Sequence, residues 1–257
     1  MESTSSSNNA PSGINDFRHS HRDREAYLQT LKSWEVSQSH ILDKLEAFPR
    51  FATKRSISRF IVKNEIFQKV LQVNGSIIEC GVFNGAGLFT WASLSEIYEP
   101  VNHTRKIIGF DTFGGFPSVS DQDNLSQFKS KKGDLRGDSL HSLEESISKH
   151  DLERALGHIP KIELVQGDFM QTGASYLEQN PHTLISLLYL DFDLYNPTNE
   201  ALKLFTPRMS AGSVIAFDEL NCCNFPGESI AYLEFLRKKS LRLERSPIDP
   251  WISWITL

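Results

Sequence analysis

Residues 76–87 read SIIECGVFNGAG, an apolar run that passes into a glycine-rich loop and then into a helical stretch. Glycines between a strand and a helix let the backbone approach a ligand closely, and the helix N-terminus favours negative charge. The order of Gly81, Gly85 and Gly87 is G-x-x-x-G-x-G, whereas a dinucleotide-binding loop reads G-x-G-x-x-G. This unit predicts an α/β fold with a ligand site after its first strand. A tight turn without a ligand is the alternative.

The rest of the chain repeats this alternation. Strands alternating with helices predict a parallel sheet covered on both faces. Two closing runs joined by a Pro-Ile-Asp-Pro turn predict a terminal antiparallel hairpin, which makes a seven-stranded, mostly parallel sheet. The predicted strands are 76–80, 106–110, 161–166, 183–190, 213–217, 241–246 and 251–257, and the predicted helices are about 87–98, 140–155, 172–179, 197–208 and 227–239.

The N-terminal region differs from the alternating part. Residues 1–20 are rich in Ser and Asn and poor in apolar side chains, which predicts a disordered tail. Apolar residues at near-helical spacing predict helices over about 23–48, where Pro49 follows, and over about 56–71. We therefore expect a single domain over 21–257, in which residues 21–72 form an N-terminal helical cap.

Composition limits the class of protein. The formal net charge of -5 gives no electrostatic reason to expect nucleic acid or an anionic membrane as the partner. No apolar run approaches the ~20 residues that span a bilayer, and the N-terminus lacks the features of a secretory signal. Three cysteines form no disulfide framework, and an odd number fits a reducing compartment. These features together predict a cytoplasmic protein.

The first glycine loop also carries an acidic residue. Glu79 stands two positions before Gly81, an arrangement typical of loops that bind S-adenosylmethionine. That cofactor has a cationic sulfonium, an amino group and a carboxylate, and it has no phosphates. We expect Glu79 to face the amino acid part of the cofactor.

The next two strands end in further polar and aromatic residues. Asp111 lies just past the second strand, where a carboxylate can accept hydrogen bonds from both ribose hydroxyls, and Phe113 and Phe116 can flank an adenine. After the third strand, Asp168 can meet the adenine amino group and Phe169 its ring face. A capping or turn-forming aspartate is the alternative for Asp111, and a Gly-Asp turn is the alternative for Asp168.

The fourth strand ends in LLYLDFDLYNPT (187–198), where an apolar run meets two carboxylates. In an extended chain, Asp191 and Asp193 point to the same side. Asn196 can cap the next helix, and Pro197 fits its first position. The two aspartates are then left without a structural role.

The fifth strand runs into Asp218 and Glu219, which places four carboxylates at successive strand ends. Like charges that crowd one crevice repel strongly unless a proton or a cation compensates. An all-oxygen set of ligands suits a hard cation, above all Mg²⁺. Separate acids, each solvated, are the alternative.

Two weaker features complete the candidate site. His141 opens a predicted helix and can assist catalysis, although a surface or capping histidine is the simpler interpretation. The connection 112–139 spans about 28 residues, which is long enough to indicate a functional lid.

The motifs ECGVFNGAG, GFDTFGGFP, YLDFDLYNPTNEAL and GSVIAFDEL resemble the macrocin O-methyltransferase family, over about residues 51–235. The resemblance implies a class I methyltransferase (Rossmann-like) fold with extra N-terminal helices, S-adenosylmethionine as methyl donor, and Mg²⁺. The phrase EPVNHTRKIIGFDTF is similar to family members that methylate deoxyhexoses at the 3-hydroxyl. Members are often dimers or larger, so we expect a homo-oligomer.

The resemblance also implies roles for individual acids. Asp191, Asp218 and Glu219 match the metal ligands of the family, and Asp193 matches the position expected to take the proton. The family commonly has two aspartates at the pair, so Glu219 departs from it. Phe192 replaces the glycine of the family's Asp-Gly-Asp-Leu-Tyr run but keeps both acids.

These residues lead to a hypothesis for function. A sugar hydroxyl, of a nucleotide-linked 6-deoxyhexose or of a glycoside, approaches the metal, which lowers the pKa of the hydroxyl. Asp193 removes the proton, with Asp191 and His141 as alternatives, and the alkoxide attacks the sulfonium methyl. Three rivals stay open: a catechol O-methyltransferase, an NAD-dependent oxidoreductase and a non-catalytic binding protein on the same fold.

Overall fold

The structure is a computed structural model that describes residues 20–126, 128–236 and 240–257. The predicted tail, up to residue 19, lies outside the described residues. The chain divides into two compact units, one up to Arg59 and the other Phe60–Leu257, and helix α4 (Lys54–Val70) runs through the division. The interpretation of residues 21–257 as one domain stays a prediction.

The N-terminal unit contains three helices: α1 (His21–Val36), α2 (Ile41–Glu46) and α3 (Phe48–Phe51). A capping box between Ser20 and Asp23 begins α1. Within the unit, the Trp34 ring packs edge-on against Phe51, with 5.0 Å between ring centroids, and Lys44 Nζ donates to the Trp34 carbonyl at 2.8 Å.

The prediction of one continuous helix over 23–48 was wrong. The chain becomes extended at Ser37, whose hydroxyl accepts from the Ser39 amide at 3.4 Å, and His40 Nδ1 accepts from the Leu42 amide to begin α2. Serine side chains that bond nearby backbone compete with the helix in this way. Pro49 lies in the first turn of α3, where a proline needs no amide donor, so it begins a helix and does not end one.

In the described residues the strands form one seven-stranded sheet in the order β3-β2-β1-β4-β5-β7-β6. Neighbours from β3 to β5 are parallel, and β7 pairs antiparallel with both β5 and β6. The predicted sheet and its terminal hairpin are confirmed. The strands are β1 (Ser76–Cys80), β2 (Ile107–Asp111), β3 (Ile162–Gln166), β4 (Ile185–Leu190), β5 (Met209–Phe217), β6 (Leu243–Arg245) and β7 (Ser253–Thr256).

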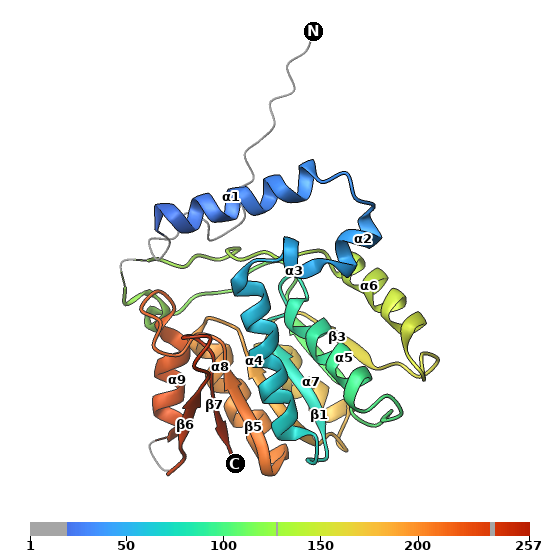
Figure 1. Ribbon diagram of the computed structural model, residues 1–257. Coiled ribbons are helices and arrows are strands. Elements are labelled where there is room, and N and C mark those ends of the chain that lie inside the picture. Colours follow the sequence, from blue (N-terminus) through green and yellow to red (C-terminus); the bar gives the residue numbers. More distant parts are fainter. Residues whose placement is uncertain (1–19, 127, 237–239) are drawn as a thin grey trace. The chain divides into compact units, whose positions relative to one another are not determined.

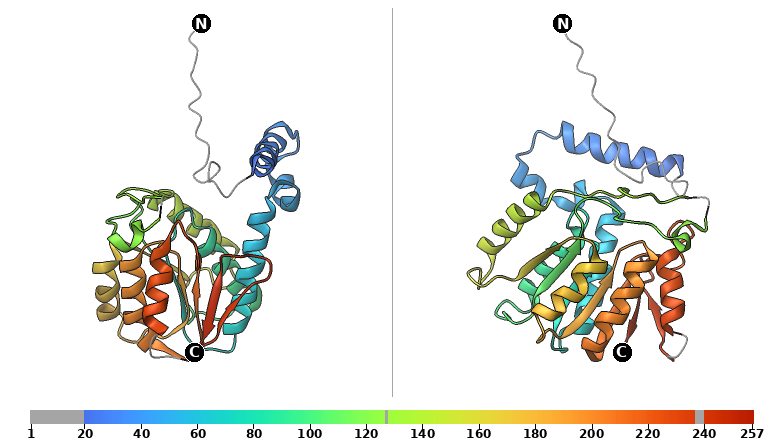
Figure 2. Two further views of the ribbon diagram at one scale, coloured as in Figure 1. Left: turned by 90° about the vertical axis from the view of Figure 1, so that its left-hand side faces the viewer. Right: turned by 180° about the vertical axis from the view of Figure 1, so that it is seen from behind.

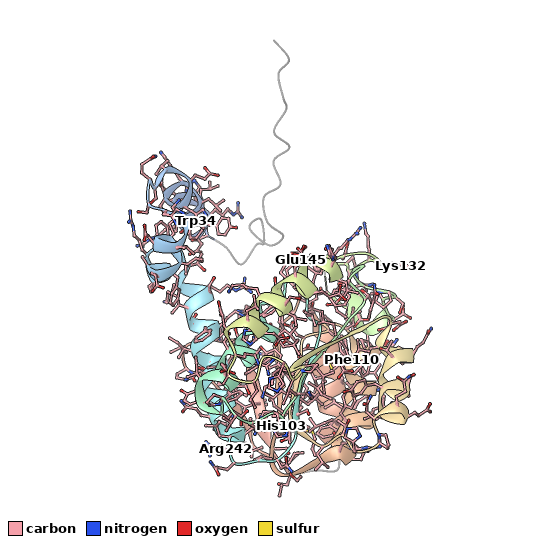
Figure 3. The ribbon with its side chains drawn as sticks, turned by 90° about the vertical axis from the view of Figure 1, so that its right-hand side faces the viewer. Trp34, His103, Phe110, Lys132, Glu145 and Arg242 are labelled. Carbon is pink, nitrogen blue, oxygen red and sulfur yellow. The ribbon has the colours of Figure 1, made fainter. Side chains whose placement is uncertain are left out.

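Helices cover both faces of this sheet (Figure 1; Figure 2, left). On one face, side chains of α4, α5 (Ala86–Tyr98) and α6 (Leu140–Glu153) form a core around Trp91 and Ile77. On the other face, side chains of α7 (Phe169–Gln179), α8 (Tyr195–Phe205) and α9 (Pro226–Leu236) form a second core. In it, the buried Phe110, labelled in Figure 3, contacts rings of α7 and α8, and Tyr232 of α9 contacts Phe217. In the part of the chain that the structure describes, every helix falls short of the length and apolarity of a membrane span.

The order of the strands reverses direction between β1 and β4, whose C-terminal ends lie side by side. From β1 the chain continues to β2 and β3 on one side, whereas β4 and β5 lie on the other side. The amide of Asp191 donates to the Cys80 carbonyl at 2.8 Å, and the amide of Asp218 donates to the Leu190 carbonyl at 2.9 Å. Ligands of open α/β sheets bind at such a point, where the strand order reverses direction.

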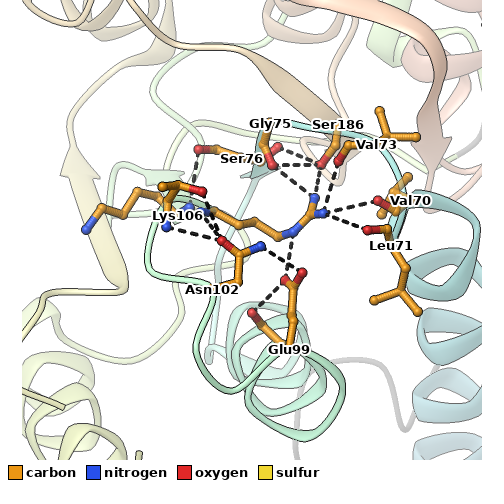
Figure 4. Close-up of polar contacts among 12 residues, drawn as sticks. Val70, Leu71, Val73, Gly75, Ser76, Glu99, Asn102, Lys106 and Ser186 are labelled. Carbon is orange, nitrogen blue, oxygen red and sulfur yellow. Dashed lines mark hydrogen bonds and ion pairs between the residues drawn. The ribbon is translucent and has the colours of Figure 1, made fainter. Parts of the chain in front are cut away.

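At the opposite, N-terminal ends of the strands, the buried Arg105 connects several elements. Its partners Val70, Val73, Glu99 and Ser186 are labelled in Figure 4. Its guanidinium donates to carbonyls that follow or end α4, those of Val70 at 3.1 Å and Val73 at 3.0 Å, and to the Ser186 hydroxyl of β4. Its Nε lies 2.7 Å from Glu99 Oε1. Carbonyls at a helix C-terminus lack partners within the helix, so Arg105 caps α4 and holds it against the sheet.

We expect Arg105→Met to lower the free energy of unfolding by about 3–5 kcal/mol, because it removes the donor to the Val70 and Val73 carbonyls and the cation beside the part-buried Glu99 carboxylate. Denaturant unfolding measures the change. Lys149→Met is the control, since Lys149 pairs with Glu153 at 3.2 Å on the exposed surface of α6, and such pairs contribute only about 0.3–0.5 kcal/mol. Equal losses in the two variants would contradict the role of Arg105.

Candidate active site

Three glycines shape the loop between β1 and α5. Gly81 and Gly85 have φ values of +95° and +80°, in the left-handed region that favours glycine. A Cβ at Gly81 would overlap the carbonyl oxygen of Asp191, and a Cβ at Gly87 would overlap Glu79 Oε1. The loop therefore needs glycine because other backbone and a carboxylate occupy the space of a side chain.

The Glu79 carboxyl lies beside Gly87 in the first turn of α5, and the residue is 2% exposed. Burial raises its pKa well above the usual range, the nearby Lys63 opposes that rise, and Asp191 and Asp218 add to it. Glu79 thus connects the glycine loop electrostatically with the acids that follow β4 and β5. Whether it faces the amino acid part of the cofactor stays a prediction.

Asp111 holds the glycine loop in place. Its Oδ2 accepts from the amides of Val82 at 2.8 Å and Phe83 at 2.9 Å, and its Oδ1 accepts from the Phe113 amide at 2.7 Å. Sequence reasoning gave Asp111 to the cofactor ribose, with a turn-forming aspartate as the alternative. The bond from the Phe113 amide, two residues on, fits that alternative, whereas the bonds to the glycine loop were not foreseen. A carboxylate oxygen has two lone pairs, so the ribose contact is compatible with these bonds and remains a prediction.

The residues predicted to surround adenine are largely packed within the protein. Phe113, with a φ of 53°, is 7% exposed. Phe169 is 3% exposed, and its ring lies 5.3 Å from that of Phe110 and 5.0 Å from that of Phe192. Asp168 caps α7 by accepting from the Met170 amide at 3.0 Å, a role that the sequence analysis did not assign to it. Their contacts with adenine stay predictions.

Acidic side chains gather where β4 and β5 end. Asp193, Asp218 and Glu219 are all less than a tenth exposed. Burial raises the pKa of Asp193 well above its usual range, and the charges of Glu219, Asp191, Glu228 and Asp218 raise it further. The acids that follow the two strands therefore influence one another electrostatically. Whether they crowd one ligand site stays a prediction.

The sequence argument that freed Asp191 and Asp193 from structural roles was wrong in its premises. Helix α8 begins at Tyr195, so Asn196 does not cap it and Pro197 is not its first residue. The strand ends at Leu190, and Asp193 has a φ of 59°, so the two aspartates do not alternate as in an extended strand. The first amide of α8 instead donates to Asp123 Oδ1, at 2.6 Å, from the 112–139 connection.

A buried lysine on α4 was missed by the sequence analysis. Lys63 is 4% exposed, and its ammonium donates to the Tyr189 hydroxyl at 2.9 Å and lies 4.0 Å from Asp218 Oδ1. The Tyr189 hydroxyl donates in turn to Asp218. Helical spacing contained the signal, since Lys63 shares a face with the buried Phe67 and Val70 at i+4 and i+7.

Glu228, in the first turn of α9, was also missed. It is fully buried, and its Oε2 accepts from the Glu219 amide at 3.3 Å. Burial raises the pKa of Glu228 well above its usual range, and Asp191 and Asp218 add to the rise. Glu228 therefore supports the backbone of Glu219. We call Asp191, Asp193, Asp218, Glu219 and Glu228 the acidic cluster.

The acidic cluster offers carboxylate oxygens, the ligands that a hard cation prefers, but these side chains are not arranged around one point as metal ligands are. Carboxylate oxygens suit Mg²⁺. Among the residues described, no group of three or more His, Cys, Asp or Glu side chains is placed to hold a metal ion. In this arrangement the ammonium of Lys63 supplies positive charge at Asp218.

The long connection 112–139 packs onto the segments that carry the acids. Phe116 joins an apolar cluster with Leu194, Cys222 and Phe225, and the ring of Phe128 lies 5.4 Å from that of Phe225. Lys132, labelled in Figure 3, is exposed on the same connection. The loop thus covers the chain that follows Asp193 and Glu219.

His141 shows no sign of a catalytic role. Its side chain is 80% exposed, and its Nε2 lies 3.5 Å from Glu145 Oε1, one turn along α6. This position agrees with the surface histidine that the sequence analysis considered simpler.

Comparison with known proteins identifies the chain. Residues 23–255 match the profile of Macrocin-O-methyltransferase (TylF). The chain belongs to the macrocin O-methyltransferase family. A search of curated proteins gives no match.

Solved structures agree with this assignment. CalS11, a calicheamicin methyltransferase, is 33% identical over 93% of both chains, with a TM-score of 0.88. The apo structure of CalS11, described as a TDP-rhamnose 3'-O-methyltransferase, is 30% identical over 93% of this chain and 95% of that one, with a TM-score of 0.79. The O-methyltransferase NovP, 20% identical with a TM-score of 0.62 over 78% of this chain and 79% of that one, shares the fold.

This member of the macrocin O-methyltransferase family is thus an S-adenosylmethionine-dependent O-methyltransferase. The class I methyltransferase fold expected from the sequence is confirmed. Family membership decides against the NAD-dependent oxidoreductase, as the glycine order already indicated.

We expect Gly87→Ala to lower the free energy of unfolding by about 1–3 kcal/mol through overpacking and to weaken binding of S-adenosylhomocysteine, because the new methyl displaces the Glu79 carboxylate. The new methyl would overlap Glu79 Oε1 at the start of α5. Isothermal titration calorimetry measures the affinity. Glu79→Ala combined with Gly87→Ala removes the overlap, so thermal stability should recover in the double variant. Unchanged affinity in Gly87→Ala would contradict this account of the loop.

Proposed function

We propose that this methyltransferase acts on a hydroxyl of a nucleotide-linked 6-deoxyhexose in natural-product biosynthesis. The observation that carries the proposal is the acidic cluster beside the glycine loop, at the point where strand order reverses. A glycine loop and a set of acids at neighbouring strand ends fit methyl transfer to a polyol. CalS11, which is 30% identical in its apo structure, is described as a TDP-rhamnose 3'-O-methyltransferase, and this likeness supports the choice of acceptor.

The proposed cofactor site follows β1, β2 and β3. Glu79 and the loop of Gly81, Gly85 and Gly87 would receive the amino acid part, and Asp111 the ribose. The buried position of Glu79 against Gly87, at the start of α5, supports a site for the amino group of this ligand next to the glycine loop. S-adenosylmethionine supplies a methyl group activated by the sulfonium.

We propose Mg²⁺ as the cation of the acidic cluster, held by Asp191, Asp218 and Glu219. The chemistry of the donors supports it, since buried carboxylates repel one another unless a cation is close. When bound, the cation lowers the pKa of a coordinated hydroxyl. Lys63, near Asp218, would share this charge compensation.

The residues of the chain would then perform the remaining steps. Asp193 accepts the proton of the acceptor hydroxyl at a carboxylate oxygen as that hydroxyl oxygen bonds to the methyl carbon. The methyl–sulfur bond breaks at the same time, and neutral S-adenosylhomocysteine leaves. The 112–139 loop excludes water and fixes the acceptor, and such positioning can supply roughly 7–11 kcal/mol of the barrier. A homo-oligomeric state stays a prediction.

The acceptor is tested by supplying S-adenosylmethionine and Mg²⁺ with TDP-rhamnose, a free 6-deoxyhexose, or a catechol. We expect methylated product, detected by mass spectrometry, chiefly with the nucleotide-linked sugar. Faster turnover of the catechol would overturn the sugar proposal in favour of that rival. Binding of both ligands without product from any acceptor would indicate a binding protein.

Removal of the proposed ligand Asp191 tests the metal site. In Asp191→Ala we expect methyl transfer to fall by at least about 100-fold, the scale of a lost charge-stabilising group, while S-adenosylhomocysteine binding survives. Mg²⁺ should raise the thermal midpoint of the wild-type protein and not that of the variant. Asp121→Asn, at an exposed loop position, is the control. Full wild-type activity in excess EDTA would defeat the proposal of Mg²⁺.

A further inference from the structure

Asp123 lies in the middle of the 112–139 loop, yet it is only 2% exposed. It belongs to the short 3₁₀ helix η1 (Asp121–Asn124). Its Oδ2 accepts from both the amide and the hydroxyl of Ser120, at 2.8 and 2.6 Å. One oxygen of the carboxylate thus holds the loop's own turn together.

The other oxygen leaves the loop and reaches a helix. Asp123 Oδ1 accepts from the Tyr195 amide, at 2.6 Å, and Tyr195 is the first residue of α8. Leu194, at the N-cap position, supplies no side-chain hydrogen bond among the described residues. A carboxylate near a helix N-terminus is favoured by the helix dipole, so the loop supplies the cap that the helix lacks.

A second helix closes on the same bond. A Cβ at Gly227, in the first turn of α9, would overlap both Asp123 Oδ1 and the Tyr195 amide nitrogen. The backbone of α9 is therefore packed directly against the hydrogen bond between the loop and α8. Glu228, the next residue, holds the amide of Glu219.

These contacts connect the loop with both acid-bearing segments. Asp193 lies two residues before Tyr195 and has a strained φ of 59°, which needs support from its surroundings. Glu219 is supported through Glu228, beside Gly227. We infer that Asp123 is a positioning residue, whose carboxylate fixes Asp193 and Glu219 when the 112–139 loop is closed. The inference rests on the proposed function, because it assigns these two acids to the reaction.

The contacts that hold the 112–139 loop on α8 and α9 also hold the segments of Asp193 and Glu219. Docking of the loop and alignment of the two acids therefore depend on the same contacts. Loosening the loop would then reduce kcat, beyond any effect on KM for the acceptor. A loop that only covers the acceptor would instead change KM and leave kcat near the wild-type value.

Asp123→Ala tests this distinction in the full-length protein with S-adenosylmethionine, Mg²⁺ and TDP-rhamnose. We expect kcat to fall about 100-fold, the scale of a small misplacement of reacting groups, with S-adenosylhomocysteine affinity unchanged. Asp123→Asn, which keeps an acceptor oxygen for Tyr195, should recover part of the loss. Asp121→Asn, on the same 3₁₀ helix but exposed, should behave as wild type. A change confined to KM, or an unchanged kcat, would overturn the inference.

Gly227→Ala disturbs the same bond from the other side while Asp123 itself is kept, so it remains informative if Asp123→Ala fails to fold. It should lower kcat as Asp123→Ala does, whereas Leu233→Ala, on the exposed face of α9, should not. Wild-type kcat in Gly227→Ala would contradict the inference.

Amide hydrogen exchange separates this inference from the proposed function. Protection of the Tyr195 amide and of residues around 116–124 should fall in Asp123→Ala and Gly227→Ala but not in the two controls. If wild-type protein methylates no sugar, the proposed function fails, while the exchange result still decides whether Asp123 holds the loop to α8 and α9. Unchanged protection in both variants would overturn that contact as the link between loop and helices.

Discussion

The structure depends on how the fold tolerates several carboxylates buried in one place. Glu79, Asp193 and Glu228 each have a pKa raised by burial and by neighbouring acids. Unpaired buried charge is costly, so such a cluster persists only where a proton, a cation or a fixed donor compensates it. The ammonium of Lys63 and the Tyr189 hydroxyl provide that compensation at Asp218. The strand order brings these groups together, because β1, β4 and β5 are neighbours.

Much of the fold was predictable because its signals are local. Alternating apolar runs and helical stretches gave the parallel sheet, and the closing pair of runs gave the hairpin. The glycine loop was predictable too, since Gly81 and Gly85 need the left-handed region and Gly87 needs the absence of a Cβ. In each case the prediction followed from the conformational or packing preference of the residue itself, without knowledge of distant contacts.

The failures come from contacts between residues far apart in sequence. Asn196 looked like a helix cap, but the cap of α8 comes from Asp123, 72 residues earlier. The break after Val36 escaped notice because the apolar period continues through serines that bond local backbone. Lys63 was overlooked because a lysine at a buried helical position has meaning only once its partner, on β4, is known. Sequence reasoning therefore named the acids but not the groups that hold them.

Arg105, at the N-terminal ends of the strands, affects where the Lys63 charge lies at their C-terminal ends. It fixes the C-terminus of α4 through the carbonyls of Val70 and Val73. Lys63 lies seven residues earlier on the same rigid helix, about 10 Å along its axis at about 1.5 Å per residue. A helix held at one end cannot slide along its axis, so the depth at which Lys63 enters the acidic cluster is set at Arg105. The position of the Lys63 charge in the acidic cluster therefore depends on contacts at the opposite edge of the sheet, where no ligand is expected.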